Sequence, residues 1–321
     1  MKKFIFCLAA SAIASTALSQ TKWDLPTGYA VNSFHTQNLQ QFANEVDQLT
    51  GGKLKITLHP GGSLFKAPEI KRAVQTGQVP TGEFILSGAT NENPLFGVDS
   101  IPFLATNYVD AKRLYAAAKP VQEKLLASQG MRVLFSVPWP GQSLYSIKPI
   151  NTPADFAGTK MRAYNPATTR IAQLLKAQPV TIQLAELSQA LATGAVQNFM
   201  TSGAGGVETK AYEQVKYFYP VNGWLPRNAT VVNQKAFDAL DKLTQEAVLK
   251  AAAAAEERGW TSSERVDGES IKELGAKGMF VSPPSDSVMK ELILIGQTMT
   301  AEWLKTAGPE GQALIDAYRK R

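Results

Sequence analysis

The spacing of apolar residues predicts alternating strands and helices in the first part of the chain. Apolar residues recur at three- and four-residue intervals over residues 39–49, which predicts a helix that a Gly-Gly pair ends. A strand near Trp23 precedes this helix, a strand at residues 53–59 follows it, and residues 67–75 form a second predicted helix. This order predicts a parallel sheet with helices on its faces.

The same patterns place further elements along the rest of the chain. We expect a helix at residues 109–130, broken near Pro120, because proline removes a helical hydrogen bond. A long helix should begin at Thr244, since the segment contains a run of alanines and no proline before Pro283. Further strands are expected at 84–86, 131–137, 144–147, 160–164, 196–201 and 228–234, and C-terminal helices at 285–306 and 309–318.

The segment from Asp155 to Thr201 places one arginine between a strand and a helix. Arg162 interrupts the strand signal at 160–164, and Asn165-Pro166 then supplies a helix-capping side chain and a proline suited to the first helical position. In open α/β sheets ligands lie at this edge, and a guanidinium there can bind a carboxylate through two charge-assisted hydrogen bonds. The alternative is a surface arginine paired with an acidic side chain.

Composition indicates an exported globular protein. The chain has 321 residues, 44% of them hydrophobic and 19% charged, and this length favours two domains over one core. Lys2-Lys3, an apolar run at 4–18 and a small-residue pattern ending at Ser19 predict a cleaved secretory signal peptide, residues 1–19. The run is too short and too rich in alanine and serine for a membrane anchor. The single cysteine, Cys7, lies inside the signal, so we expect no disulfide or thiol chemistry.

Charge and the small number of candidate catalytic groups argue against nucleic-acid binding and catalysis. Loss of Lys2-Lys3 lowers the formal net charge from +6 to +4, and the remaining cations are scattered, which slightly favours anion capture. Only His35 and His59 are present, so we expect no metal site. Gly203–Gly206 lacks the rest of a nucleotide-binding loop and is interpreted as a flexible turn before a helix at Val207. No cofactor is expected.

Four groups of motifs occur in order between about Trp23 and Leu314. The central segment contains K-M-R, A-Q-P-V and E-L-S-Q-A-L-A-T-G-A-V; the others are Thr50-Gly51-Gly52-Lys53, Ile101-Pro102-Phe103-Leu104, and Lys148-Pro149-Ile150 with Pro153-Ala154-Asp155. This series resembles the TRAP-transporter solute-binding proteins, the DctP-like periplasmic receptors for organic acids. That family reads approximately K-I-R, G-A-x-P-V and E-V-Y-x-A-L-Q-x-G-V-V-D-G over the central segment.

The resemblance implies an α/β fold, that of a two-domain periplasmic binding protein with a hinge and a central ligand cleft. A long helix would bridge both domains, and the chain would cross to the second domain at Trp139-Pro140-Gly141. We expect domain I to comprise 20–139 plus 228–267, and domain II to comprise 140–227 plus 268–321.

The resemblance also implies a function. The chain would be a periplasmic, monomeric receptor that binds a small organic acid and delivers it to a TRAP-type permease driven by an ion gradient. The mature chain would not insert into the membrane, would bind no nucleic acid and would not be an enzyme. Two alternatives remain: a receptor for an ATP-driven importer or sensor kinase, and a secreted enzyme that uses Arg162 to position an acid substrate.

Candidate ligand contacts come from the same resemblance. Arg162 matches the family's carboxylate-binding arginine. The other candidates are Asn165, Leu184 and Thr201, with Phe34 and His35 from the first loop and Trp224. Some relatives carry a second arginine where this chain has Gly141-Gln142-Ser143, so we expect a monocarboxylate ligand, unless Arg227 supplies the second charge. Gln197-Asn198 also replaces the usual Asp-Gly turn.

Overall fold

The first domain is built on two small sheets. The computed structural model describes residues 20–320, and the predicted signal peptide lies outside them. β1 (Thr21–Pro26) pairs in parallel with β2 (Leu54–His59), while β10 (Arg227–Asn233) lies between β3 (Thr81–Ile85) and β4 (Met131–Pro138) and is antiparallel to both. The expectation of a parallel sheet is therefore wrong for this second group, because β10 returns from the second domain in the opposite direction.

The helices of the first domain follow the apolar spacing, with one difference. α1 (Phe34–Leu49) and α2 (Ala67–Gln75) occupy the predicted positions. α3 (Tyr108–Ser128) continues through Pro120 instead of breaking there. Because Pro120 is exposed, the missing backbone hydrogen bond falls on the solvent side of the helix. The short elements are η1 (Leu86–Ala89), η2 (Pro94–Ser100) and α7 (Gln234–Asp238).

The second domain has a mixed sheet with the strand order β11-β9-β5-β8-β6-β7. β6 runs parallel to β7 and β8, and β5 runs antiparallel to β8 and β9. The strands are β5 (Ser143–Ser146), β6 (Lys160–Ala163), β7 (Gln178–Thr181), β8 (Asn198–Thr201), β9 (Tyr217–Tyr219) and β11 (Phe280–Val281). The helices are α4 (Pro166–Leu174), α5 (Leu187–Ala192) and α6 (Gly203–Glu208), with η3 (Pro153–Phe156), η4 (Leu184–Glu186) and η5 (Ala211–Glu213).

The glycine-rich segment after β8 is helical, which corrects its interpretation as a flexible turn. It forms α6, and the side chain of Ser202 caps the helix by accepting a hydrogen bond from the N–H of Gly205. A side chain at Gly206 would overlap the Tyr145 ring, and one at Gly203 would press on the neighbouring helix at Ser270. The glycines therefore permit close packing, which outweighs their low helix propensity.

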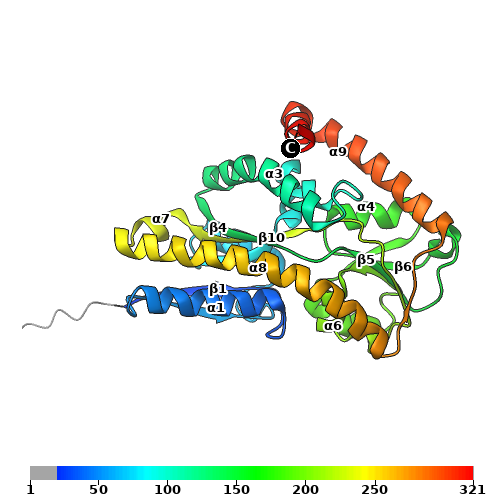
Figure 1. The fold of residues 1–321 in the computed structure, drawn as a ribbon, viewed down its shortest axis with the longest axis horizontal. Helices are drawn as coiled ribbons and strands as arrows, with labels where there is room; N and C mark the ends of the chain where they lie inside the picture. The colour runs from blue at the N-terminus through cyan, green and yellow to red at the C-terminus, as the bar shows by residue number, and fades with distance from the viewer. Residues whose placement is uncertain (1–19, 321) are drawn as a thin grey trace, which may run out of the picture.

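The long helix α8 (Lys242–Ala276) bridges both domains, as expected (Figure 1). Ala251, Ala252 and Ala255 pack in the core of the first domain, and Leu274 packs in the core of the second. At Gly259 a β-carbon would clash with Val137 of β4. Small residues thus let the helix lie directly on the first domain before it reaches the second.

A second helix also contacts both domains. α9 (Asp286–Lys320) begins on the second domain, where Leu292 and Ile295 join its core, and ends beside α3, where Ile315 is buried (Figure 1). It kinks at Gly308, whose φ of 60° and ψ of −147° suit glycine. Because α8 and α9 both contact the two domains, the predicted division at 267/268 stays a prediction.

Candidate functional site

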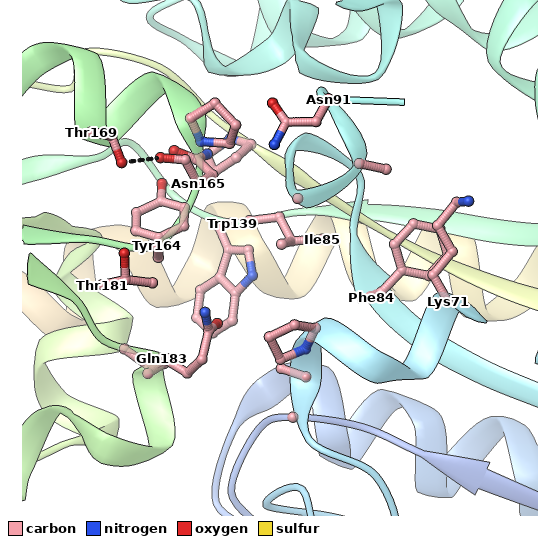
Figure 2. Close-up of a pocket in the computed structure, with 18 of the residues that line it drawn as sticks. Lys71, Phe84, Ile85, Asn91, Trp139, Tyr164, Asn165, Thr169, Thr181 and Gln183 are labelled. Carbon is pink, nitrogen blue, oxygen red and sulfur yellow. Dashed lines mark hydrogen bonds between the residues drawn. The ribbon is translucent and has the colours of Figure 1, made fainter. Parts of the chain in front are cut away.

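A cavity of about 620 Å³ lies where the two domains face each other. The first domain contributes α2 and the end of β3, and the second contributes the ends of β6 and β7 and the start of α4. Figure 2 shows Trp139 from the crossing segment between the two sides, with Tyr164 and Gln183 on one side and Ile85 on the other. The site is therefore assembled from segments far apart in the sequence.

Arg162 reaches the cavity from the carboxyl end of β6. The residue is 3% exposed, and its Nε donates to the backbone carbonyl of Ile182 at 2.8 Å. Its guanidinium carbon lies 4.9 Å from the centre of the Tyr164 ring, a cation–π distance. One terminal nitrogen, Nη1, is buried and has no hydrogen-bond partner within residues 20–320. The arginine is thus held in place with a donor unused.

Burial dominates the electrostatics of this arginine. It lowers the pKa of Arg162 to about 10, against smaller raising effects of Tyr164, Tyr29 and Glu186. The guanidinium remains charged at neutral pH, but an unpaired charge in this environment is unfavourable. An anion placed in the cavity would relieve that penalty, so the geometry suits a carboxylate.

Tyr164 and Gln142 support the arginine. The Tyr164 hydroxyl donates to Gln142 Oε1 at 3.2 Å, and Gln142 Nε2 donates to the carbonyl of Pro140 at 3.0 Å. Burial raises the pKa of Tyr164, which keeps the hydroxyl protonated and able to donate. The crossing segment between the domains is thereby connected to the residue that flanks Arg162.

Asn165 both caps a helix and links the domains. Its Oδ1 accepts from the N–H of Thr168 at 2.8 Å, which satisfies the first turn of α4. Its Nδ2 donates to Ser87 Oγ of the first domain at 2.8 Å. The side chain also lines the cavity, beside Thr169 (Figure 2). The predicted capping role is confirmed, and the contact with the first domain is additional.

The remaining sequence candidates divide into two groups. Leu184 and Thr201 line the cavity with Arg162 and Asn165. Phe34, His35 and Trp224 are outside its lining. Phe34 and His35 pack behind Trp139, with ring centres 5.3 Å and 4.4 Å from it. Trp224 is 1% exposed and belongs to the core of the second domain.

Three cations in or near the cavity have acidic partners, while Arg72, which also lines it, is exposed to solvent. Arg227 points away from it: its Nε lies 3.2 Å from Asp99, and its Nη2 donates to Gln122 at 2.9 Å. At the rim, Lys71 pairs with Glu92 at 2.5 Å and Arg170 pairs with Glu302 at 2.6 Å. The position of Arg227 therefore does not support its suggested role as a second charge in the cleft.

Sequence reasoning missed several lining residues, for identifiable reasons. Tyr164 follows Arg162 by two positions, so strand alternation places both on one face, a signal that was available. Glu83 is the one acidic residue in the short strand β3, and an acid at such a position was also a visible sign of a functional residue. Tyr29 and Gln142 lie in irregular segments, and their positions depend on tertiary structure.

The comparisons with known proteins agree with this architecture. The model of the DctP family, described as bacterial extracellular solute-binding protein, family 7, matches residues 27–305. None of the helices within residues 20–320 has both the length and the apolar character required to cross a bilayer.

Three solved structures are particularly similar. DctP6 of Bordetella pertussis, an extracytoplasmic solute receptor binding pyroglutamic acid, is 51% identical, with a TM-score of 0.92 over 94% of this chain and 100% of that chain. A marine metagenome TRAP solute-binding protein specific for pyroglutamate is 44% identical, with a TM-score of 0.92 over 94% of this chain and 99% of the other. DctP7 of Bordetella pertussis, which also binds pyroglutamic acid, is 40% identical, with a TM-score of 0.92 over 93% of this chain and 99% of the other. The resemblance seen in the sequence is confirmed: the chain belongs to the DctP family of extracytoplasmic solute-binding proteins of TRAP transporters.

Proposed function

We propose that this receptor binds pyroglutamate through Arg162 and delivers it to a TRAP-type permease. Support for the ligand comes from the three receptors above, which bind pyroglutamate and share 40% to 51% of their residues with this chain. Pyroglutamate is a small cyclic monocarboxylate, so it falls within the class expected from the sequence. Support for a receptor rather than an enzyme comes from the family, whose members here are solute-binding proteins.

The observation that carries the proposal is the unused, buried donor of Arg162. A carboxylate at Nη1 would turn an unpaired buried cation into an ion pair with charge-assisted hydrogen bonds. Because the surroundings exclude water, that pair is stronger than the same pair at the surface. The bond from Nε to Ile182 and the Tyr164 ring keep the guanidinium in one orientation, which reduces the entropy lost on binding.

The rest of the cavity suits a compact ring with one charge. Trp139 and Leu184 supply apolar surface to the cavity. Packing the ligand ring against them gains about 25 cal/mol for each Å² of apolar surface removed from water. A second ligand carboxylate would need a second buried, unpaired cation. Lys71 and Arg170 already pair with acids, and Arg72 is exposed to solvent, where an ion pair contributes little. We therefore expect discrimination against dicarboxylates such as succinate and against open-chain glutamate.

Calorimetric titration of the purified mature protein tests the proposal, with pyroglutamate, glutamate, succinate and lactate as ligands. Pyroglutamate should bind most tightly. At a hundred times its Kd it should raise the unfolding free energy by roughly 2.7 kcal/mol, which shifts Tm by several degrees. Tighter binding of glutamate or succinate would refute the assignment. Native mass spectrometry of the protein purified from periplasm provides an independent check through co-purified ligand.

A further inference from the structure

Glu83 is a buried carboxylate in the wall of the cavity. It lies on β3 in the first domain, is 2% exposed and lines the same cavity as Arg162. A buried carboxylate is unfavourable unless donors satisfy its oxygens, and beside a ligand anion it would also repel the ligand. Its presence in this cleft therefore calls for a compensating donor.

The protein satisfies one oxygen of Glu83 well and the other poorly. Thr27 Oγ1 donates to Oε2 at 2.6 Å. Nδ1 of His35 lies 3.3 Å from Oε1. A carboxylate offers about four acceptor positions, so these two contacts leave acceptor capacity unused.

The His35 nitrogen near Oε1 is also approached by Asn228. Asn228 Oδ1 accepts from the Tyr29 hydroxyl at 3.1 Å and from Trp139 Nε1 at 3.2 Å, which fixes the orientation of the amide. Its Nδ2 therefore faces His35 Nδ1, at 3.3 Å. A neutral ring nitrogen either donates or accepts, and when Nδ1 accepts from Asn228 it cannot donate to Glu83.

Protonating both ring nitrogens of His35 would not resolve this competition. The other nitrogen, Nε2, is buried and has no hydrogen-bond partner in the described chain, so a proton there would be an unsatisfied donor. If Asn228 donates to Nδ1, the ring proton is on Nε2, and if Nδ1 instead donates to Glu83, the N–H of Asn228 that faces the ring has no acceptor, so each tautomer leaves one buried donor unpaired. In both tautomers Glu83 keeps unused acceptor capacity on Oε1, because a carboxylate oxygen has two acceptor positions and at most one is used by His35.

We propose that Glu83 accepts the lactam N–H of pyroglutamate and thereby selects for lactam acids over ring acids that lack this donor. This inference rests on the proposed function. Arg162, on the second domain, would hold the carboxylate, while Glu83, on the first domain, would hold the N–H of the same ring. A ligand with both groups contacts both domains, whereas a simple carboxylic acid contacts only the arginine.

Two ligands and two variants test the inference by calorimetry. The ligands are pyroglutamate and the cyclopentanone analogue in which a CH₂ group replaces the lactam N–H. Wild-type protein should prefer pyroglutamate by roughly a hundredfold, because the analogue leaves the carboxylate oxygen without a donor. Glu83→Gln should weaken pyroglutamate binding by about ten- to a hundredfold, leave the analogue within about threefold, and so largely remove the preference.

Glu92→Gln is the matched control, since Glu92 also lines the cavity but is paired with Lys71. It should shift the affinity of both ligands in parallel. Equal wild-type affinity for the two ligands, or parallel losses in Glu83→Gln, would overturn the inference but not the proposed function. Failure of wild-type protein to bind pyroglutamate would overturn both. If Glu83→Gln does not fold, a crystal structure of the wild-type complex decides: a lactam nitrogen within hydrogen-bond distance of Glu83 supports the inference, and one facing another acceptor refutes it.

Discussion

Replacing Arg162 by methionine should abolish ligand binding while leaving the ligand-free fold intact. Burial lowers the pKa of the guanidinium to about 10, which corresponds to a penalty on the order of 3 kcal/mol on its charged form. Methionine retains most of the apolar stem and removes that penalty. The variant loses the hydrogen bond to Ile182 and the contact with the Tyr164 ring, each worth about 1 kcal/mol. These terms nearly cancel, so ligand-free stability should be close to that of the wild type.

The effect on binding should be much larger. Removing one partner of a buried ion pair typically costs about 3–5 kcal/mol, equivalent to roughly a hundred- to several-thousand-fold in Kd. Arg162→Lys should also bind poorly, because a lysine keeps the charge but loses the planar pair of donors and the bond from Nε. Calorimetry with pyroglutamate measures the affinity, and urea denaturation of the ligand-free protein measures the stability.

Two results would refute this reasoning. If Arg162→Met binds pyroglutamate within about threefold of wild type, the carboxylate is bound elsewhere. If the variant instead loses more than about 3 kcal/mol of unfolding free energy, Arg162 is a structural residue and its buried charge is already compensated in the ligand-free protein.

Three further predictions concern residues around the cleft. Burial, the largest effect, raises the pKa of Glu208 to about 7 despite the hydrogen bond it accepts from Ala30, so its folded state favours the protonated form. Its contribution to stability is therefore present at low pH and lost as pH rises through about 7. In urea denaturation, Glu208→Gln should raise the unfolding free energy by about 1–2 kcal/mol near pH 8 and by less near pH 5. Equal effects at both pH values would contradict this. Arg227→Met should lower the unfolding free energy by about 3–5 kcal/mol, because it leaves Asp99 buried without its cation. The Kd for pyroglutamate should stay within about threefold of wild type. A large loss of binding without a loss of stability would place Arg227 in the site. Ser87→Ala removes the hydrogen bond from Asn165 but leaves the helix cap. The variant should bind pyroglutamate about fivefold more weakly in calorimetry, with little change in ligand-free Tm. A loss of Tm without a loss of affinity would show that this hydrogen bond has only a structural role.

The sequence predicted the longer elements of the fold better than the short ones. α2 spans the predicted residues, and α8 bridges the domains as the resemblance implied, because regular apolar spacing and a run of alanines are strong local signals. The four-residue strands β5, β6 and β8 were predicted, but β7 and β9 were not. β7 is mostly exposed and contains a proline, so it lacks the signal of a buried strand, and β9 has only three residues. α6 was interpreted as a turn because its glycines disfavour helix locally, and only packing against Tyr145 and α8 explains them.

The site was predictable where chemistry and local structure coincide. Arg162 and Asn165 stand out because a strand end, a cap and a proline fix where their side chains lie. The groups that surround the arginine in space could not be found in this way. Gln142 reaches Tyr164 from the segment in which the chain crosses between the domains, and Glu83 faces the same cavity from the opposite domain. Such proximity follows from topology, which one sequence without its fold does not reveal.

The buried charge of Arg162 also has a consequence for domain closure. In the structure the domains are joined by the bond from Asn165 to Ser87 and by the contact of Glu208 with Ala30, while Nη1 of Arg162 has no partner among residues 20–320. Closing without a ligand therefore brings the first domain against an unpaired cation, and the added loss of solvent is a penalty on the closed state. A carboxylate removes that penalty, so the arginine makes closure depend on the ligand. Arg162→Met should then close without ligand more readily than wild type, which small-angle scattering would detect as a smaller radius of gyration for the ligand-free variant. A ligand-free variant as extended as the ligand-free wild-type protein would show that closure is limited by something other than the arginine's charge.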